Sequence, residues 1–228
     1  MAILCGSLFL FWSLFPIIQY ELFARFILNT RIISPTDNGS SSVVEGFTNK
    51  KSTVYTTNLA DYTKAASWFP TVYADDTPAK RAFSVSEYTI SIPKLDIYDA
   101  KVQVNGEDLL KGLIHFQPRV LPCEYGKVTI FGHSTHPALA RFTTDKLYTS
   151  IFTYLATLTS GDRVILTIGD ITCEYQVVDK FEVEPSQVSV LEQQYDRPYL
   201  YLITCTPPGT YLRRLVIATE LVKLPDVH

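Results

Sequence analysis

The stretch Tyr201–Glu220, YLITCTPPGTYLRRLVIATE, contains two runs of strand-forming residues around a turn rich in proline and glycine. Proline cannot donate to a strand ladder and Pro-Gly pairs mark turns, so the pattern predicts an antiparallel hairpin. Its first strand ends at Cys205, and its second begins at Arg213 and Arg214. The hairpin therefore brings a thiol and a guanidinium together at the rim of a sheet.

Short runs of β-branched and aromatic residues recur from Glu87 onward, in YTISIPKLDI, AKVQV, GKVTIF and PYLYLITC. The segment DRVILTIGDITCEYQVV is typical of two strands joined by a tight turn at Gly169 and Asp170. A parallel α/β sheet needs a helix at each crossover, and this sequence does not supply them. We therefore expect a mainly β fold, a small barrel or a sandwich.

One segment, FTTDKLYTSIFTYLATLTSGD at residues 142–162, has helical periodicity. Leu147, Ile151, Leu155 and Leu158 recur at the spacing of one helix face, and threonine and aspartate are available as caps. The pattern predicts a single helix that packs its apolar side against the sheet.

Composition excludes some classes of function. The apolar fraction of 46% allows a substantial core, while a net charge of −3 without a basic stripe gives no support for a nucleic-acid partner. None of the four cysteines has C-x-x-C spacing, which argues against a thiol redox motif or a zinc knuckle. Cys5 lies in an apolar terminal segment, and the other three cysteines cannot all pair with one another. At least one thiol is therefore expected to be free, unless it pairs with another chain.

The first 20 residues, MAILCGSLFLFWSLFPIIQY, carry no charge and have about the length that a bilayer core requires. A cleaved signal peptide is the alternative, but a basic start and a small-residue cleavage site are not evident. We expect residues 1–28 to form a single-pass membrane anchor in contact with lipid. Arg25 and Arg31 follow this segment, which by the positive-inside rule points the chain toward the cytoplasm. We expect a short cytoplasmic leader to precede it, with the rest of the chain extracytoplasmic.

Residues 29–86 differ in composition from the residues that follow. SPTDNGSSSVVEGFTNKKST is polar and without period, as a stalk or linker would be. YTKAASWFPTVYADDTP is more apolar and could dock on the domain, but Pro70 and Pro78 exclude a long helix. Composition favours an exposed tether, so we expect a stalk over residues 29–86 and the folded domain over residues 87–228.

Cysteine catalysis needs a thiolate, a proton shuttle and a group that stabilises an oxyanion. Cys205 taken alone is typical of a buried structural cysteine, but the nearby arginines could favour its thiolate. His133 ends the strand GKVTIF at a Gly-His corner, where its imidazole would emerge at a sheet rim. His136 is a weaker candidate in the following loop, and His115 is expected to be a strand or loop residue with a satisfied partner. A metal site built on the two histidines of FGHSTH lacks a third ligand nearby.

The order of these motifs resembles the sortase family. IFGHS is followed by a helix, a Gly-Asp hairpin, LITC and RLVIATE. The family signature T-L-x-T-C corresponds here to YLITC, with Tyr201 in place of the usual threonine and with Leu202, Thr204 and Cys205 in register. ISIPKLDI resembles the family's first barrel strand. The resemblance covers about residues 87–222 and implies a closed eight-stranded β-barrel with one or two short helices.

The resemblance also implies an activity, that of an extracytoplasmic transpeptidase. Cys205 would attack the Thr–Gly bond of an LPXTG-like sorting signal on a secreted protein and form a thioester. His133 would act as general acid and then as base, and an arginine would stabilise the oxyanion. An amine from a peptidoglycan precursor or a pilin lysine would resolve the thioester. Thr204 would shape the substrate groove, and no cofactor is implied.

The choice of arginine rests on the register of the second strand. Alternation along the strand sends Arg213 and Arg214 to opposite faces, so one of them at most points into the groove. Alignment on VIAT favours Arg213, whereas the short loop after Cys205 favours Arg214, and we expect Arg214.

Two departures from parts of the family matter. FQPRVLPCEYG carries a single acid, Glu124, so we expect no calcium requirement. The Asp-Pro-aromatic motif of a pilus-type lid is absent, which favours protein anchoring over pilus polymerisation, although SWFP could cover the groove. A non-catalytic β-barrel binding module and a hydrolytic cysteine peptidase stay open as alternatives.

Overall fold

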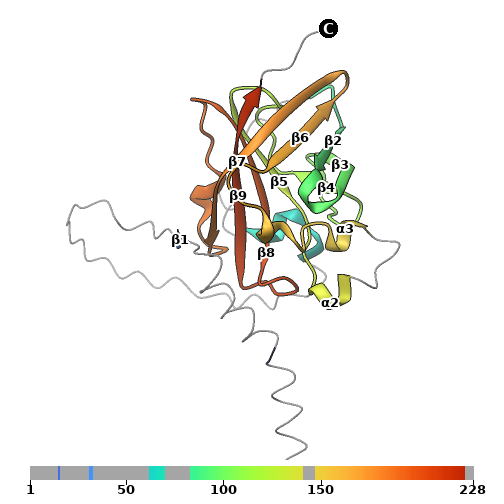
Figure 1. Cartoon of the computed structure of the whole chain (residues 1–228), viewed down its shortest axis with the longest axis vertical. Coiled ribbons are helices and arrows are strands. Elements are labelled where there is room, and N and C mark those ends of the chain that lie inside the picture. The colour runs from blue at the N-terminus through green and yellow to red at the C-terminus, as the bar shows by residue number, and fades with distance from the viewer. Residues whose placement is uncertain (1–14, 16–30, 33–61, 70–82, 141–146, 224–228) are drawn as a thin grey trace, which may run out of the picture.

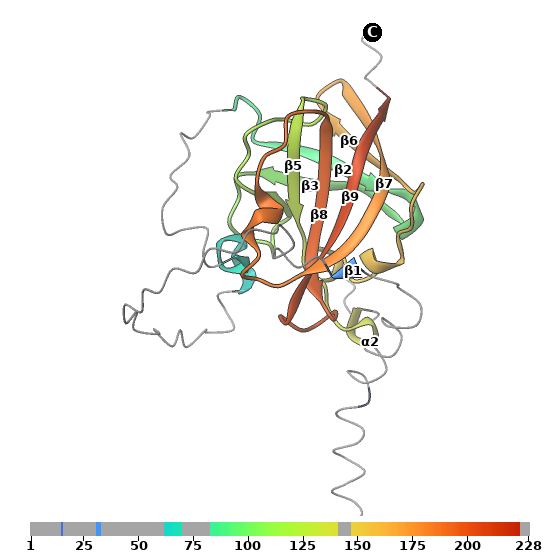
Figure 2. The same cartoon turned by 90° about the vertical axis from the view of Figure 1, so that its left-hand side faces the viewer.

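Eight strands close into a barrel in the computed structural model of the chain (Figures 1 and 2). The structure describes residues 15, 31–32, 62–69, 83–140 and 147–223. Neighbouring strands follow the order β7-β6-β2-β3-β4-β5-β8-β9, and β9 pairs again with β7 to close the ring. The bounds are β2 (Glu87–Ile92), β3 (Ile97–Val104), β4 (Leu113–His115), β5 (Gly126–Phe131), β6 (Arg163–Ile168), β7 (Ile171–Val183), β8 (Pro198–Thr206) and β9 (Arg213–Lys223).

A further short strand, β1 (Arg31–Ile32), pairs parallel to β7. The helical elements of the described residues are short: η2 (Ala65–Trp68), η3 (Pro93–Leu95), α2 (Pro137–Ala140), α3 (Leu147–Ser150), η4 (Leu155–Thr157) and η5 (Val188–Leu191). The mainly β fold, the closed eight-stranded barrel and the two short α-helices confirm the expected fold class.

No helix within these described ranges has both the length and the apolar character needed to cross a bilayer. The anchor that the sequence predicts over residues 1–28 lies outside the described residues, apart from Phe15.

Alternation along the strands creates two apolar layers. One cluster contains residues of all eight barrel strands, such as Leu202 of β8 and Ile217 of β9, and fills the interior. The other, which we call the outer cluster, lies on the opposite face of β4, β5, β7, β8 and β9. It consists of Ala65, Trp68, Phe69, Leu109, Ile114, Phe116, Phe131, Phe181, Val183, Ile203, Cys205, Val216 and Ala218.

Residues 62–69 pack on the outer cluster and are not the exposed tether that composition favours. Lys64 forms an isolated antiparallel bridge with Asp108, and Ala65 N–H donates to the carbonyl of Glu107 at 3.1 Å. Trp68 and Phe69 are fully buried. Composition misses this contact because it averages over the whole polar segment. The burial of three apolar side chains, those of Ala65, Trp68 and Phe69, is enough to hold residues 62–69 on an apolar face.

The single helix expected over residues 142–162 is interrupted. The structure has α3, a turn and then η4, although Ile151, Leu155 and Leu158 are buried as the periodicity requires. The Phe152 N–H donates to the carbonyl of His133 at 2.9 Å, and Thr135 N–H donates to the Thr153 hydroxyl at 3.0 Å. These bonds to the His133 segment replace helical bonds in a run of threonines and aromatics with modest helix propensity.

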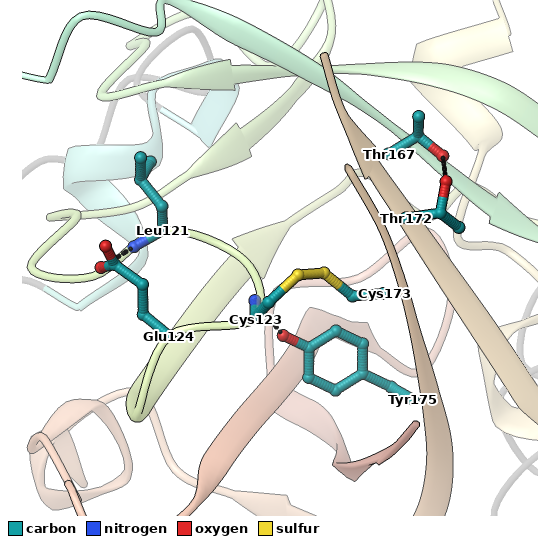
Figure 3. The surroundings of a disulfide bond; sticks show 7 residues. All are labelled: Leu121, Cys123, Glu124, Thr167, Thr172, Cys173 and Tyr175. Atoms are coloured by element: carbon teal, nitrogen blue, oxygen red, sulfur yellow. Dashed lines mark hydrogen bonds between the residues drawn. A yellow bond between two sulfur atoms is a disulfide. The ribbon is translucent and has the colours of Figure 1, made fainter. Parts of the chain in front are cut away.

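A disulfide joins Cys123, in the connection before β5, to Cys173 of β7 (Figure 3). The main-chain N–H of Cys123 also donates to the hydroxyl of Tyr175 at 2.9 Å. The bridge closes a segment with a sequence separation of 50 residues. Cys205 is free, in agreement with the expectation of at least one unpaired thiol.

Replacing both Cys123 and Cys173 with serine is expected to lower the free energy of unfolding by about 2–4 kcal/mol. The cross-link restricts the unfolded chain, so its removal favours unfolding. Urea denaturation of the native and double-variant proteins measures the difference. A reducing agent should destabilise the native protein but not the variant; equal midpoints for both proteins would contradict the stabilising role.

Candidate active site

Cys205 lies near the end of β8 on the outer face of the barrel. Its side chain is 3% exposed and belongs to the outer cluster, next to Ile203 and Val216. The β8–β9 ladder pairs Cys205 directly with Arg214 and Thr206 with Arg213. Because directly paired residues of antiparallel strands point to the same face, Arg214 shares the face of the thiol and Arg213 does not.

The two arginines have different partners. Arg213 ion-pairs with Glu182 at 3.4 Å and with Glu184 at 3.3 Å. Arg214 is 1% exposed, and its Nη1 donates to the carbonyls of Tyr211 and Arg213. The guanidinium beside Cys205 is therefore that of Arg214, which is the arginine that the loop length favours.

His133 follows β5, which pairs parallel to β8 with Phe131 opposite Ile203. Two residues farther along each strand, the same register sets His133 beside Cys205, on the face that Phe131 and Ile203 share. The N–H of Gly132 donates to the carbonyl of Ile203 at 3.2 Å, which extends the pairing beyond the last strand residue.

Two hydroxyl groups tie the histidine segment to the cysteine strand. Thr204 Oγ1 donates to the carbonyl of Gly132 at 2.7 Å, and Ser134 Oγ donates to the carbonyl of Cys205 at 2.7 Å. Thr204 is buried on the face opposite to that of Cys205, and its role in shaping the substrate groove stays a prediction. It holds the Gly132–His133 corner. Ser134 could not be identified from the sequence, because a serine after a histidine has no signal of its own.

Two glycines allow the loops to approach closely. A Cβ on Gly132 would lie 2.4 Å from Leu113 Cδ2 and 2.5 Å from Phe152 Cδ2, so only glycine fits before His133. Gly209, in the β8–β9 turn, has φ +83°, and a Cβ there would lie 3.0 Å from His136 N. The turn after Cys205 thus packs directly on the loop after His133.

Trp68 lies between the arginine and the histidine. Its main-chain carbonyl accepts a hydrogen bond from Arg214 Nη2 at 3.0 Å, and the guanidinium carbon is 5.5 Å from the indole centroid. The indole centroid is also 5.2 Å from that of Phe131 and 5.8 Å from that of His133. Trp68 and Phe69 of the SWFP stretch therefore cover this part of the outer face, whereas Pro70 lies outside the described residues.

Burial determines the protonation states of the Cys205 thiol and the His133 imidazole. Burial raises the pKa of the Cys205 thiol to about 11, although the Arg214 guanidinium acts in the opposite direction. Burial lowers the pKa of His133 to about 4, with the Asp108 carboxylate opposing it. At neutral pH the structure therefore holds a thiol and a neutral imidazole, and Nε2 of that imidazole has no hydrogen-bond partner among the described residues.

Alkylation of Cys205 by iodoacetamide is expected to become about tenfold faster per pH unit from pH 6 to 9.5, without a plateau. The thiolate is the reactive form, and its fraction rises tenfold per unit below the pKa of about 11. Mass spectrometry of the Cys205 peptide gives the rate. In urea the alkylation rate of Cys205 should level off near pH 9, since the ordinary thiol pKa is about 8.5. If the rate in the folded protein also levelled off there, the raised pKa would be contradicted.

The other histidines have different surroundings. His136 immediately precedes α2, and its carbonyl accepts the N–H of Leu139 at 2.8 Å. His115 is a strand residue of β4, as expected, but it is 1% exposed and its Nδ1 has no partner among the described residues. Burial lowers its pKa to about 3. The expectation that no metal or calcium is needed stays a prediction.

Comparison with known families and curated proteins identifies related sequences. The model of the Sortase domain matches residues 90–222, more than half of the chain. Sortase D of Bacillus subtilis (strain 168) is 26% identical over 121 residues, which cover 52% of this chain and 53% of that protein. This match therefore spans about half the length of that relative.

Solved structures share the fold. Sortase C-3 from Streptococcus pneumoniae is 30% identical, with a TM-score of 0.51 over 63% of this chain and 65% of that chain. The pilus-related sortase C of Group B Streptococcus is 26% identical, with a TM-score of 0.52 over 62% of this chain and 70% of that chain.

Proposed function

The chain belongs to the sortase family, and from this we propose that it is a membrane-anchored cysteine transpeptidase acting on an LPXTG-like sorting signal. The enzyme cleaves the signal between Thr and Gly and transfers the acyl group to an amine. One observation supports this proposal above the others: β8, β9 and the end of β5 bring Cys205, Arg214 and His133 to one end of one barrel face.

The first half of the reaction is acyl transfer to sulfur. As the thiol of Cys205 attacks the Thr carbonyl, its proton passes to the neutral imidazole of His133, whose Nε2 is unpartnered among the described residues. The tetrahedral intermediate then collapses, the Thr–Gly bond breaks, and the imidazolium gives the proton to the departing glycine amine. A thioester between Cys205 and the threonine remains.

The second half reverses these roles. An incoming amine attacks the thioester carbonyl, His133 accepts the proton from the amine nitrogen, and the C–S bond breaks. The sulfur leaves as a thiolate and takes a proton from the imidazolium, which regenerates the starting thiol and imidazole. The amine comes from a peptidoglycan precursor or from a pilin lysine.

Arg214 is placed to bind the carbonyl oxygen on which negative charge develops. Its Nη2 already donates to a carbonyl, that of Trp68, at 3.0 Å. Its Nε has no hydrogen-bond partner among the described residues and remains available to a substrate carbonyl. Because Arg214 is 1% exposed and Trp68 lies over its guanidinium, residues 62–69 must shift to admit the substrate. Because this segment covers the site without an Asp-Pro-aromatic motif, the absence of that motif does not separate anchoring from pilus polymerisation.

The disulfide supports the extracytoplasmic location that the proposal requires. Disulfides persist in oxidising compartments and are rare in the cytoplasm, and the chain has one between Cys123 and Cys173. With residues 1–28 in the membrane, the domain lies where secreted proteins and cell-wall amines occur.

The proposal is tested by incubating the full chain with an LPETG peptide, with and without triglycine, and identifying the products by mass. A transpeptidase gives the LPET-triglycine conjugate and little free LPET acid when the amine is present. Free acid alone, in equal amounts under both conditions, would instead indicate a hydrolytic peptidase. An intact peptide under both conditions would leave no support for either activity.

A further inference from the structure

Lys127 is a buried lysine on the same barrel face as Cys205. It lies on β5 opposite Tyr199, four residues before Phe131, so alternation turns its side chain toward the outer face. The residue is 2% exposed. Lysine is almost never fully buried unless partners satisfy its ammonium group, so its contacts indicate what it does there.

Those contacts hold one segment, residues 188–193, which we call the η5 segment. Lys127 Nζ donates to the carbonyl of Val190 at 2.9 Å and lies 4.7 Å from the ring centroid of Tyr201. Its main-chain N–H donates to Gln193 Oε1, and Gln193 Nε2 donates back to its carbonyl, both at 2.9 Å. One strand residue thus fixes the middle and the C-terminal end of the segment with three hydrogen bonds.

The η5 segment extends the apolar surface away from the thiol. Val188, Val190 and Leu191 pack against the outer cluster, which contains Cys205 itself. Figure 2 shows this short helix, in orange, beside β5, the strand whose Lys127 holds it. The segment is therefore an apolar wall on the face that holds the candidate active site.

Strand spacing relates this wall to a substrate. Tyr201 lies four residues before Cys205, or about 13 Å at about 3.3 Å per residue. An extended sorting signal with its threonine carbonyl at Cys205 has its leucine three residues upstream, about 10 Å away. β8 ends one residue beyond Cys205, so the apolar surface lies in the direction of Tyr201 and the η5 segment.

We propose that Lys127 is a positioning residue for substrate recognition, which fixes the η5 segment as the wall for the apolar N-terminal end of the sorting signal. The inference rests on the proposed transpeptidase activity. Lys127 acts through the η5 segment and Tyr201 and does not reach the reacting atoms.

The test compares the full native chain with a Lys127→Met variant, which keeps the apolar stem and loses the ammonium group. We expect KM for an LPETG peptide to rise about tenfold and kcat to stay within about twofold, because ground-state and transition-state binding are lost together. An APETG peptide should be discriminated against by the native enzyme and about tenfold less by the variant. Lys101→Met, which removes an exposed lysine paired with Glu87, is the matched control and should change neither value.

A second variant guards against a folding defect. Gln193→Leu removes the same clamp from the side of the η5 segment and should reproduce the rise in KM and the loss of discrimination, with thermal unfolding checked for both variants. The inference is overturned if the native enzyme processes LPETG and the correctly folded variants keep its KM and its discrimination, or lose kcat alone. If the native chain does not process LPETG at all, the proposed function fails, and this inference fails with it.

Discussion

A Cys205→Ala protein is expected to lose at least about 10⁴-fold in transfer activity, because its methyl group cannot form the thioester that both half-reactions share. The residue is buried among apolar side chains of the outer cluster, so alanine fits without introducing a polar group. Rates of LPETG-to-triglycine transfer, measured over hours with high enzyme, give the residual activity. Circular dichroism shows whether the barrel is intact.

The matched control replaces the two disulfide-bonded cysteines, which lie away from the candidate active site. Replacing Cys123 and Cys173 together leaves Cys205 in place, so that variant should keep transfer activity at temperatures where it stays folded. Transfer by Cys205→Ala within tenfold of the native rate would mean that another group is the nucleophile.

An Arg214→Met protein is expected to lose about 10²–10³-fold in kcat, the range found when one donor to a developing oxyanion is removed. Arg214 is paired with Cys205 across the β8–β9 ladder, and its Nη2 already donates to a carbonyl. Because methionine keeps much of the side-chain length, packing against Trp68 and Phe69 is largely retained. Steady-state kinetics with LPETG and triglycine separate kcat from KM.

The neighbouring arginine provides the control for this prediction. Arg213 faces away from Cys205 and pairs with Glu182 and Glu184, so Arg213→Met should keep kcat within about threefold and lower thermal stability slightly. Equal losses of kcat in both variants would show that the arginines act on the hairpin as a whole. A loss confined to Arg213→Met would reverse the assignment.

Local signals in the sequence were sufficient to predict a mainly β fold, a small barrel or a sandwich, and the resemblance to sortases selected the closed barrel. The strand pattern and the Gly169-Asp170 turn predict the β6–β7 hairpin, and the run before Cys205 predicts β8 with nearly its observed bounds. Alternation alone separates Arg213 from Arg214, and the loop length selects the one that faces the thiol. These features depend on neighbours within one hairpin, where pattern and register are closely linked.

What the sequence could not supply depends on contacts between distant segments. Trp68 meets Arg214 across 146 residues, and Lys127 meets Val190 across 63. β4 is three residues long, too short for a periodic signal, and the pairing of Cys123 with Cys173 depends on which strands the barrel brings together. The interrupted helix after residue 147 likewise follows from bonds to the His133 loop.

The most direct test of the central claim is intact-mass spectrometry of the full chain mixed with LPETG peptide in the absence of an amine. A thioester mechanism at Cys205 predicts an adduct with the mass of the peptide through its threonine, located on Cys205 by peptide mapping. The adduct is released as the LPET-triglycine conjugate when triglycine is added. A chain that stays unmodified while the peptide remains intact, or an adduct located on another residue, would contradict it.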